Sequence, residues 1–411
     1  MSELLERGRN RLEWARAHMD VLAAIRRELV RGKAFRGLRI GMALHVEAKT
    51  GVLALVLREA GAQVRLASCN PLSTDDSVVA ALRDDGLDVH AKKWETEDEY
   101  DEYLHNVLDL RPNVVIDDGG DLIYRLHTSR RDLLSDVIGA NEETTTGIIR
   151  VRAMEKAGKL AFPVIDVNDA MTKHLFDNRY GTGQSTIDGI MTATNLLLAG
   201  KRFVVAGYGW CGRGIAMRAR GMGAHVLVTE VDPIKAIEAK LDGFEVLTMV
   251  EAAKRADFIV TATGNKDVVT AKHLRAVRDG CILANAGHFN VEVSMEDLDA
   301  LAVRKRRARE FVDEYTLRGG KRVCVLAEGR LVNLAAGQGH PVEIMDMSFS
   351  IQALCAALLA KRGKGLEPRV HPVPRDVDER VARLKLRAMG VGIDALTPTQ
   401  KKYLASWTEG T

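Results

Sequence analysis

The sequence predicts an α/β protein with two doubly wound, parallel-sheet domains and a short helical tail at the C-terminal end. Short apolar runs alternate with helical patterns along most of the 411 residues, and strands joined by helices produce that alternation. A glycine-rich loop, 207–212, follows the apolar run 202–206 in the middle of the chain. A chain of this length divides into two or three domains. The loop is therefore expected to open a second domain.

The first domain is expected to span residues 1–180 and to be completed by residues 342–385. It begins with an amphipathic pattern over 3–31, in which Leu5, Leu12, Leu22 and Ile25 recur near helical spacing, and this pattern predicts one long helix. Buried strands are expected at 38–44, 63–68, 114–118 and 163–167, and helices near 49–60, 76–84, 97–109 and 147–158. This order of elements is typical of a parallel sheet with both faces covered.

The second domain is expected to span residues 184–334. Its strands are expected near 202–206, 225–229, 258–263, 281–285 and 323–327. A helix near 343–361 follows, and Pro368, Pro372 and Pro374 then break the pattern. Residues 377–411 are expected to form a helix and a short tail, with the tail itself covering 386–411.

Composition excludes several classes of protein. The net charge of +3 gives no electrostatic support for a nucleic-acid partner, and the basic run 304–309 is expected to be a solvated helix face. No apolar stretch approaches the ~20 residues of a membrane span, and Glu3, Glu6 and Arg7 interrupt any signal-peptide pattern. The chain is therefore expected to be cytoplasmic, with a small molecule as its substrate and no membrane partner.

The five cysteines are scattered and form no CxxC pair. That distribution favours a reducing compartment and argues against a disulfide framework or a structural zinc site. Most of the cysteines are expected to be small buried hydrophobes, and no metal site is predicted.

The loop Gly207-Tyr-Gly209-Trp-Cys-Gly212 has the GxGxxG spacing of a dinucleotide site, with a strand before it and a helix after it. The glycines permit a tight turn, a close approach to pyrophosphate and close helix–strand packing. Glu230 follows the next strand and can accept a hydrogen bond from a ribose hydroxyl, which selects NAD over NADP. The alternative is a glycine-rich packing turn in an ordinary βαβ unit.

Ionisable residues gather where strands are expected to end. The five segments are 44–50, 116–121, 141–147, 167–178 and 285–289. Ligands of open parallel sheets bind beyond the carboxyl ends of the strands, so these segments are expected to face a cleft between the domains. Taken singly, each has a structural alternative, because a strand-terminal Asp or Asn is often a helix cap and a lone histidine is often structural.

Together these residues supply more acid–base groups than a simple alcohol dehydrogenase needs. Lys173 and Asp177 are four residues apart and would share a helix face. Asp118 and Glu143 supply carboxylates for proton transfer or hydroxyl binding. His45 and His288 titrate near neutral pH. The set therefore suggests an oxidation combined with further steps on one substrate.

At these residues the sequence resembles the S-adenosylhomocysteine hydrolase family, over about residues 36–408. The matching segments are Asp117-Asp-Gly-Gly-Asp-Leu122, Glu142-Glu-Thr-Thr-Thr-Gly147, Asp177-Asn-x-Tyr-Gly181, Ala206-Gly-Tyr-Gly209, Thr229-Glu-x-Asp-Pro233, Gly287-His-Phe289 and Leu326-Ala-Glu-Gly-Arg-Leu-Val-Asn-Leu334. The resemblance implies that the first domain binds the substrate, that the second is a Rossmann domain with one tightly bound NAD, and that the chain forms a homotetramer.

The family reaction is a reversible hydrolysis of S-adenosyl-L-homocysteine to L-homocysteine and adenosine. The resemblance implies that NAD⁺ takes a hydride from the ribose C3′, which acidifies the C4′ proton. Removal of that proton expels homocysteine from C5′, water adds, and the stored hydride returns to C3′.

The resemblance also implies roles for individual residues. Lys173, held by Asp177 and Asn168, is the expected base at the 3′-hydroxyl. His45 and Asp118 are the expected acid–base pair at C4′ and C5′. The remaining expected roles are ribose binding for Glu143, the junction of nicotinamide and substrate for Asn178 and His288, a gate over the base for His340, and NAD contacts for Thr144, Thr145, Thr146, Gly207, Gly209, Gly212, Glu230, Lys235, Gly287 and Asn333.

One departure concerns the base. Better-known members carry His-x-Thr-x-Glu or His-x-Thr-x-Gln, whereas this chain has His45-Val-Glu47-Ala-Lys49, the variant of archaeal and thermophilic members. Lys49 has three donors and no acceptor, which suits the O6 of hypoxanthine, and Glu47 suits its N1–H. S-inosyl-L-homocysteine is therefore an alternative substrate. The other interpretation is a Glu47–Lys49 ion pair beside an adenine pocket.

Other departures are smaller. Many members end in a Lys-x-x-x-Tyr-x-Tyr tail that reaches the NAD of a neighbouring protomer; the segment 405–411 lacks it, which puts that contact in doubt. Trp210-Cys211 replaces a usual Asp-Val without changing a glycine, and Thr182-Gly183 replaces a usual Cys-Arg. Two rival functions stay open: a catalytically silent nucleotide-binding regulatory homologue, and an NAD-dependent 2-hydroxy-acid dehydrogenase.

Overall fold

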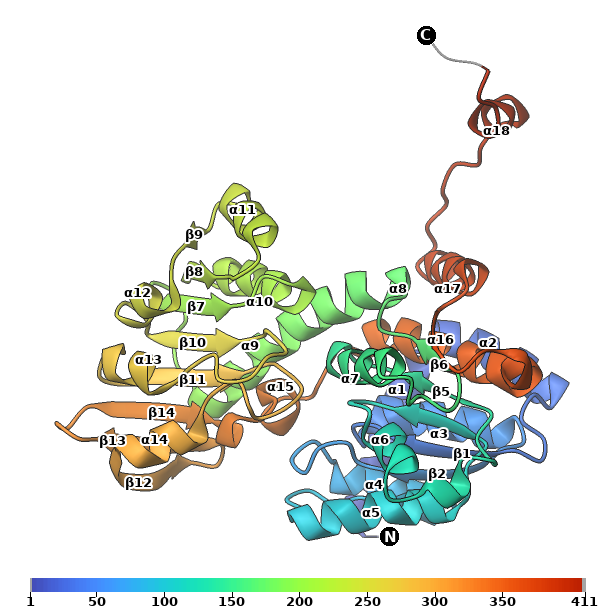
Figure 1. The fold of residues 1–411 in the computed structure, drawn as a ribbon, viewed down its shortest axis with the longest axis horizontal. Coiled ribbons are helices and arrows are strands. Elements are labelled where there is room, and N and C mark those ends of the chain that lie inside the picture. The colour runs from blue at the N-terminus through green and yellow to red at the C-terminus, as the bar shows by residue number, and fades with distance from the viewer. Residues whose placement is uncertain (1, 409–411) are drawn as a thin grey trace.

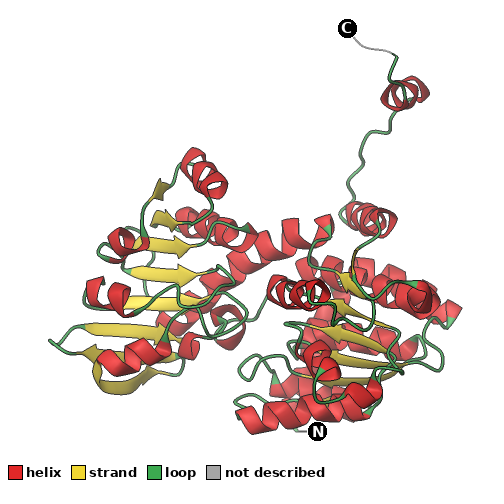
Figure 2. Ribbon diagram, viewed as in Figure 1, coloured by secondary structure: helices red, strands yellow, loops and turns green. Residues whose placement is uncertain are grey.

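The computed structural model describes residues 2–408, which form two α/β domains lying side by side (Figure 1). Each domain has a central sheet with helices on both faces (Figure 2). The sheet of the first domain has the order β15-β6-β5-β4-β1-β2-β3, and all its pairs are parallel. Its strands are β1 (Arg39–Ala43), β2 (Gln63–Ala67), β3 (Asp88–His90), β4 (Val114–Asp117), β5 (Gly139–Glu142), β6 (Val164–Asp166) and β15 (Val370–Pro372).

Two cores fill the space between this sheet and its helices. One core joins the sheet to α1 (Glu3–Ala17), α2 (Asp20–Gly32), α3 (Ala48–Glu59), α4 (Asp76–Asp84), α16 (Val342–Arg362) and α17 (Arg375–Ala388). The other core joins it to α5 (Glu97–Asp109), α6 (Asp121–His127) and α7 (Thr145–Lys156). Successive residues of β4 belong to opposite cores, so every side chain of that strand is buried. This is why the predicted strands read as continuous apolar runs.

The single helix expected over residues 3–31 is wrong. The chain breaks at His18 and Met19, where Met19 leaves the helical region with φ −112° and ψ 62°. Helix α1 then packs on α3 and α4, whereas α2 packs on α16 and α17. The carboxylate of Asp346 accepts hydrogen bonds from the first N–H groups of α2, at Val21 and Leu22. A partner so distant in sequence leaves no signal beside the break.

Three short strands of the first sheet are absent from the sequence expectations. Strand β5 has the sequence Gly-Ala-Asn-Glu, which carries no apolar pattern, although all four residues are buried. Strands β3 and β15 are three residues long and lie at the two edges of the sheet. The neighbouring strands, not their own side chains, hold these segments extended.

The second sheet has the order β12-β13-β14-β11-β10-β7-β8-β9. A parallel sheet was expected. Strand β13 runs antiparallel to both of its neighbours, so the sheet is mixed. Its strands are β7 (Arg202–Ala206), β8 (His225–Thr229), β9 (Glu245–Val246), β10 (Phe258–Thr261), β11 (Cys281–Asn285), β12 (Ala302–Arg309), β13 (Val312–Leu317) and β14 (Arg322–Leu326). Its helices are α9 (Thr182–Thr194), α10 (Trp210–Gly221), α11 (Pro233–Leu241), α12 (Met249–Ala253), α13 (Ala271–Ala276), α14 (Met295–Leu301) and α15 (Val332–Ala335).

The basic run 304–309 is a strand, not the expected helix face. It forms most of β12, the edge of the second sheet, and its side chains are exposed. Arg306 and Arg307 form ion pairs with Glu314 and Asp313 of the neighbouring strand β13. Charged side chains on an edge strand discourage pairing with other chains, which gives this run a structural explanation.

Among the described residues, one helix, Val342–Gly365, is long and apolar enough to cross a membrane, with a mean hydropathy of 1.5. From the sequence, no apolar stretch was expected to approach the length of a membrane span, and this helix corrects that expectation. Of its 18-residue apolar window, 72% is buried within the protein, where α16 packs against α2, α3 and α17. Its apolar surface is thus accounted for by the core of the first domain.

The C-terminal part holds two helices where one was expected. Helix α17 packs on the first domain, and the chain then runs extended to α18 (Pro398–Ala405), which stands away from both domains (Figure 1). Thr397 caps α18 through a reciprocal hydrogen-bond pair with Gln400. None of the residues of α18 is buried.

Candidate functional site

The site lies where both sheets change winding direction. In the first sheet, β1 lies between β2 and β4; in the second, β7 lies between β8 and β10. Connections leave such neighbouring strands in opposite directions and open a crevice at their carboxyl ends. Segments from both crevices line one cavity of about 880 Å³, large enough for a dinucleotide together with a small substrate.

The structure brings nearly all the predicted site residues to this cavity. Its lining includes His45, Glu47, Lys49, Asp118, Glu143, Thr144, Thr145, Thr146, Lys173, Asp177, Asn178, Gly207, Gly209, Glu230, Lys235, Gly287, His288, Asn333 and His340. Two predicted residues lie just behind the surface: Asn168, which contacts Lys173, and Gly212, which packs beneath the glycine loop.

Two of the three loop glycines are required by their surroundings, and the third faces open space. Gly207 has φ +95°, and a Cβ there would lie 2.7 Å from the carbonyl oxygen of Ala262. A Cβ on Gly212 would lie 1.9 Å from the carbonyl oxygen of Gly207, so α10 can pack this closely only with glycine. A Cβ on Gly209 would meet nothing within 4 Å, because this residue faces open space. The turn, the close packing and the open approach are those that a pyrophosphate site needs.

The end of β8 presents an oriented carboxylate. Glu230 Oε2 accepts from the N–H of Tyr208 at 2.6 Å, and its Oε1 accepts from the N–H groups of Val231 at 2.6 Å and Asp232 at 3.1 Å. These bonds hold the carboxylate against the glycine loop, where it can accept from a ribose hydroxyl. Farther along the cavity, the buried Asn333 Oδ1 has no hydrogen-bond partner, so it is available to an amide donor. Both features fit a nicotinamide dinucleotide.

Lys173 lies at the centre of a buried polar cluster. Its Nζ donates to Asn178 Oδ1 at 2.9 Å and to Asn168 Oδ1 at 3.3 Å. The same Nζ lies 3.6 Å from Glu143 Oε1 and 3.7 Å from Asp177 Oδ1. Burial alone would lower the pKa of Lys173, but the charges of Asp177 and Glu143 outweigh it and raise the pKa above its usual value. The resting side chain is therefore an ammonium.

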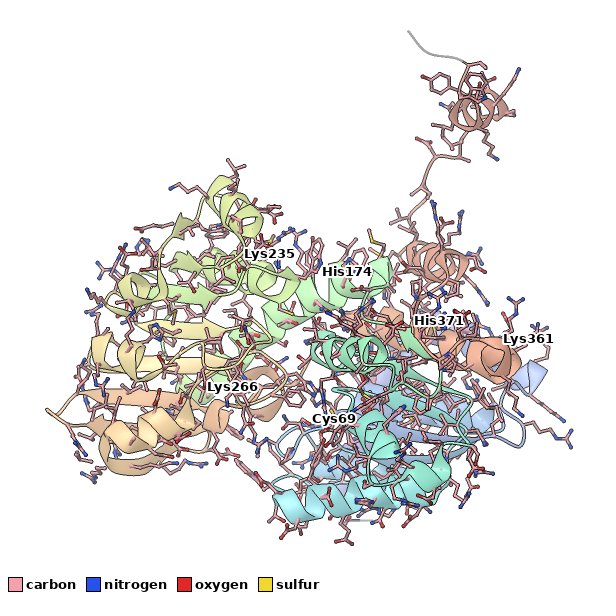
Figure 3. The ribbon with its side chains drawn as sticks, in the orientation of Figure 1. Cys69, His174, Lys235, Lys266, Lys361 and His371 are labelled. Carbon is pink, nitrogen blue, oxygen red and sulfur yellow. The ribbon has the colours of Figure 1, made fainter. Side chains whose placement is uncertain are left out.

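The backbone around Lys173 is unusual. Residues His174–Gly181 form a π-helix, which follows the short α8 (Met171–Lys173) and leads into α9. Such wide turns occur mostly at functional sites. Here the wide turn places both Asp177 and Asn178 beside Lys173. Figure 3 labels His174 where the chain passes between the domains, and its ring lies 5.2 Å from that of Trp210 in the second domain.

Helix α16 supplies two contacts that the sequence analysis missed. Ser348 Oγ donates to Asp177 Oδ2 at 2.7 Å, and Gln352 Nε2 donates to Glu143 Oε2 at 2.6 Å. Asn141 Nδ2 donates to the Gln352 side-chain oxygen at 3.0 Å and so fixes the orientation of its amide. The sequence signal that could have indicated these contacts is the presence of polar residues inside an otherwise apolar helix. Ser348 and Gln352 are both fully buried.

The two acidic partners of Lys173 have opposite pKa shifts. Burial raises the pKa of Glu143 to about 7, although Lys173 opposes the shift. Burial would also raise the pKa of Asp177, but the charges of Lys173 and His340 hold it well below its usual range. Asp177 is thus a permanent anion, whereas Glu143 can change its protonation state near neutral pH.

A second cluster joins the domains around Asp118. His45 Nε2 lies 3.4 Å from Asp118 Oδ2, and His288 Nδ1, from the second domain, lies 3.5 Å from Asp118 Oδ1. Burial lowers the pKa of His45 to about 4 despite the neighbouring carboxylate, so the ring is neutral at neutral pH. The contact is close: a Cβ on Gly119, which has φ +106°, would lie 2.4 Å from His288 Nε2. A neutral imidazole beside a carboxylate can pass a proton.

Two further carboxyl groups bind the backbone of the loops next to this cluster. Asp117 Oδ2 accepts from the N–H of Ile123, and Glu142 Oε1 accepts from the N–H groups of Gly119 and Thr144. Burial raises the pKa of Asp117 to about 7 and raises that of Glu142 well above its usual value. These bonds fix the loops that carry Asp118 and the threonines at the start of α7.

The segment expected to contact the base is an ion pair in the structure. Lys49 Nζ lies 2.7 Å from Glu47 Oε2 and donates to the carbonyl oxygen of Gln338 at 3.1 Å. Glu47 also caps α3, accepting from the N–H groups of Lys49 and Thr50. Nearby, His340 Nδ1 lies 2.9 Å from Asp177 Oδ1. The structure thus contains the Glu47–Lys49 ion pair, and both side chains still face the cavity.

Two family models match the chain. Residues 2–138 match the model described as S-adenosyl-L-homocysteine hydrolase, and residues 178–339 match the one described as S-adenosyl-L-homocysteine hydrolase, NAD binding domain. The second match agrees with the glycine loop and with NAD as the cofactor.

Close relatives cover nearly the whole chain. An adenosylhomocysteinase from Thermoplasma acidophilum is 58% identical over 98% of this chain and 98% of its own length. An S-inosyl-L-homocysteine hydrolase from Methanocaldococcus jannaschii is 56% identical over 99% of this chain and 98% of its own. Among solved structures, a dipicolinate synthase polypeptide from Bacillus halodurans is similar in fold alone, with a TM-score of 0.50, 14% identity, and coverage of 80% of this chain and 99% of that one.

Proposed function

Because this chain belongs to the S-adenosyl-L-homocysteine hydrolase family, we propose that it hydrolyses an S-nucleosyl-L-homocysteine to L-homocysteine and the free nucleoside. The protein is an NAD-dependent hydrolase, and S-adenosyl-L-homocysteine is the default substrate of the family. The observation that carries the proposal is the single cavity shared by Lys173, Asp118, His45 and the glycine loop.

We propose that the two domains bind different ligands. Residues 1–180 with 342–385 bind the substrate, and residues 184–334 bind NAD through the glycine loop, Glu230, Lys235, Gly287, Asn333 and the threonines 144–146. When bound, NAD accepts a hydride from the ribose C3′ and later returns it. The polar residues of the first domain then handle the protons of the reaction.

Lys173 is the proposed base at the 3′-hydroxyl. In its resting state it is an ammonium, so it must release a proton before it can accept one. A second positive charge bound in the same cavity would favour that release, since like charges disfavour the ionised form. Asp177, Asn168 and Asn178 hold Nζ in place throughout. Glu143 is the proposed partner of the ribose hydroxyls.

Asp118 and His45 are the proposed acid–base pair at C4′ and C5′. The neutral ring of His45 can accept a proton, and its contact with Asp118 stabilises the imidazolium that forms. His288 closes the other side of Asp118 from the second domain. The pair itself lies within the first domain, and the second domain adds His288 to it.

One observation favours S-inosyl-L-homocysteine as a second candidate substrate. The oxygens of Glu47 already accept from Lys49 and Thr50, which leaves little capacity to accept from an adenine amino group. Lys49 has three N–H donors. Two of them are used on Glu47 and Gln338, which leaves one for an acceptor such as O6. His340 is the proposed gate residue over the base.

We propose that the chain assembles as a homotetramer in the cytoplasm. Val231, Ile234, Ile237 and Leu241 form an exposed apolar stripe on and beside α11, and such a stripe is typical of an interaction surface. All five cysteines are free thiols, which suits a reducing compartment.

The test is an assay of the purified holoenzyme with both S-nucleosyl substrates, following homocysteine thiol and NADH together. We expect thiol release with no net NADH accumulation. Stoichiometric NADH accumulation would instead indicate a dehydrogenase, and release of no thiol from either substrate would indicate a silent homologue.

A positioning role is predicted for Gln352. Gln352→Leu removes the amide donor that stabilises the Glu143 carboxylate, so the pKa of Glu143 rises further above about 7. The acid limb of the kcat/KM profile should move to higher pH, with about a tenfold loss at pH 6.5 that recovers at pH 9. Ser350→Ala, on the same buried helix, is the control. A uniform loss at every pH would mean that Gln352 is merely structural.

A further inference from the structure

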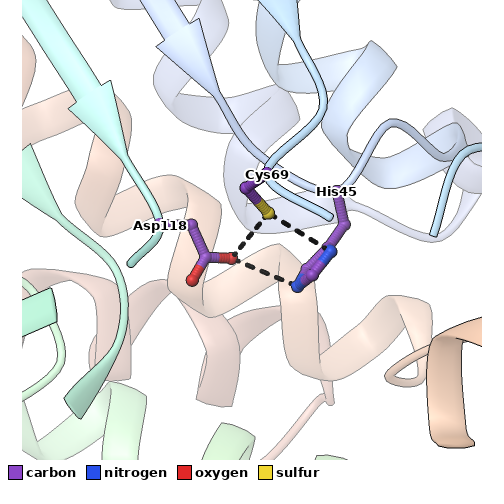
Figure 4. Close-up of side chains that lie close together, drawn as sticks. All are labelled: His45, Cys69 and Asp118. Atoms are coloured by element: carbon purple, nitrogen blue, oxygen red, sulfur yellow. Dashed lines mark hydrogen bonds and ion pairs between the residues drawn. The ribbon is translucent and has the colours of Figure 1, made fainter. Parts of the chain in front are cut away.

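Three side chains able to bind a metal meet beside the cavity: His45, Cys69 and Asp118 (Figure 4). They follow β1, β2 and β4, three neighbouring strands of the first sheet. Each offers one ligand atom, and these atoms lie within 4.8 Å of one another. Cys69 and Asp118 are buried and His45 is nearly so. The cluster is therefore built into the fold and is unlike a group of exposed acids.

The distances from Asp118 to the other two side chains suit a tetrahedral cation. In a site with bonds of about 2.0–2.3 Å, ligand atoms lie about 3.3–3.8 Å apart. His45 Nε2 lies 3.4 Å from Asp118 Oδ2, and Cys69 Sγ lies 3.7 Å from the same oxygen. Cys69 Sγ also lies 3.3 Å from the other ring nitrogen of His45, Nδ1. Ser73 Oγ contacts His45 Nδ1 at 2.8 Å and orients the ring, as outer partners of metal-bound histidines do.

The donor types select the cation. One thiolate, one imidazole and one carboxylate suit Zn²⁺ and similar thiophilic ions, whereas Mg²⁺ and Ca²⁺ prefer oxygen alone. His45 and Asp118 also line the cavity, which gives an ion a route in and leaves its fourth position open to water.

We propose that His45, Cys69 and Asp118 form a binding site for a thiophilic divalent cation of the Zn²⁺ class. Binding forms bonds to His45 nitrogen, Asp118 oxygen and Cys69 sulfur, and the Cys69 thiol proton passes to solvent. The site itself rests on geometry and not on the proposed function. Its consequence does rest on that function: an ion bound here occupies the proposed acid–base pair, so Zn²⁺ is a reversible inhibitor.

Cobalt provides a readout that is independent of activity. Co²⁺ added to the untagged holoenzyme should bind with one ion per chain and produce the near-ultraviolet thiolate-to-metal charge-transfer band of a cysteine ligand. Zn²⁺ should displace it and remove the band. Absence of the band from the wild-type protein would overturn the proposal, whatever the variants do.

Two cysteine variants locate the ligand. Cys69→Ser should lose the band and weaken Zn²⁺ binding at least about tenfold, since even loss of an outer partner costs about 10–100-fold. Cys211→Ser, which alters a different cysteine, one that lines the cavity, should keep both. Loss of the band in the Cys211 variant, or unchanged Zn²⁺ affinity in the Cys69 variant, would contradict the site. Zn²⁺ binding without inhibition would contradict the proposed role of His45 and Asp118 and leave the site intact.

Discussion

Replacing Lys173 with alanine should lower kcat by at least about 10³-fold while NAD stays bound, because general acid–base groups contribute about 10²–10⁴-fold. Lys173 Nζ is within 4 Å of Asn168, Asn178, Glu143 and Asp177, and no other lysine lines this part of the cavity within the described residues. Glu143 lies beside Lys173, but its proposed role is to bind the ribose hydroxyls, so we do not expect it to restore the lost base. Steady-state kinetics and the NAD content of the purified variant measure the two effects.

Loss of the ammonium also leaves the Asp177 carboxylate buried beside an empty position, and removal of one partner of a buried pair costs about 3–5 kcal/mol. Lys173→Arg is the matched control, since it keeps a cation there but does not release a proton at working pH. It should be as inactive as the alanine variant with a melting temperature closer to wild type. Near-normal turnover in either variant would remove the assigned role of Lys173.

The second large effect is a change of base preference in Lys49→Gln. The glutamine amide can both donate and accept, so it can pair with an adenine amino group, whereas Lys49 can only donate. The ratio of kcat/KM for S-adenosyl- over S-inosyl-L-homocysteine should rise by about 10–100-fold, the worth of one or two buried hydrogen bonds. Measurement of both substrates with wild type and variant gives this ratio directly.

Lys93→Gln is the matched control for this change. Lys49 and Lys93 each donate from the first domain to a carbonyl near the domain junction, Gln338 and Ala335 respectively, but Lys93 does not line the cavity. If Lys49 acted only by holding the domains together, both variants would behave alike. An unchanged preference in Lys49→Gln would mean that Lys49 does not read the base.

The central strands and the glycine loop could be predicted because their signals are local. Strands β7, β8 and β11 begin and end at the expected residues, since buried parallel strands are continuous apolar runs. The glycine loop was predicted from its three glycines. Gly207 and Gly212 have the tight turn and the close packing expected of them, and Gly209 leaves open space beside the loop. Residues at strand ends were grouped correctly, because the carboxyl ends of parallel strands meet at one edge of a sheet.

The features that were missed depend on partners far apart in sequence. The break between α1 and α2 is stabilised by Asp346, and the orientation of Glu143 depends on Gln352. Strand β5 is extended because its neighbours pair with it, although its own residues are polar or small. The position of Cys69 beside His45 and Asp118 was missed for the same reason, because no spacing pattern joins residues that follow three separate strands.

Hydrolysis through oxidation at C3′ and proton removal at C4′ leaves a different isotopic record from direct attack of water on C5′. The decisive measurement is the position of deuterium in the nucleoside formed in D₂O, followed by NMR. We expect deuterium at C4′, delivered through Asp118 and His45, and retention of the original hydrogen at C3′. A product with no deuterium at C4′ would contradict the proposed route, because direct displacement at C5′ leaves that hydrogen in place.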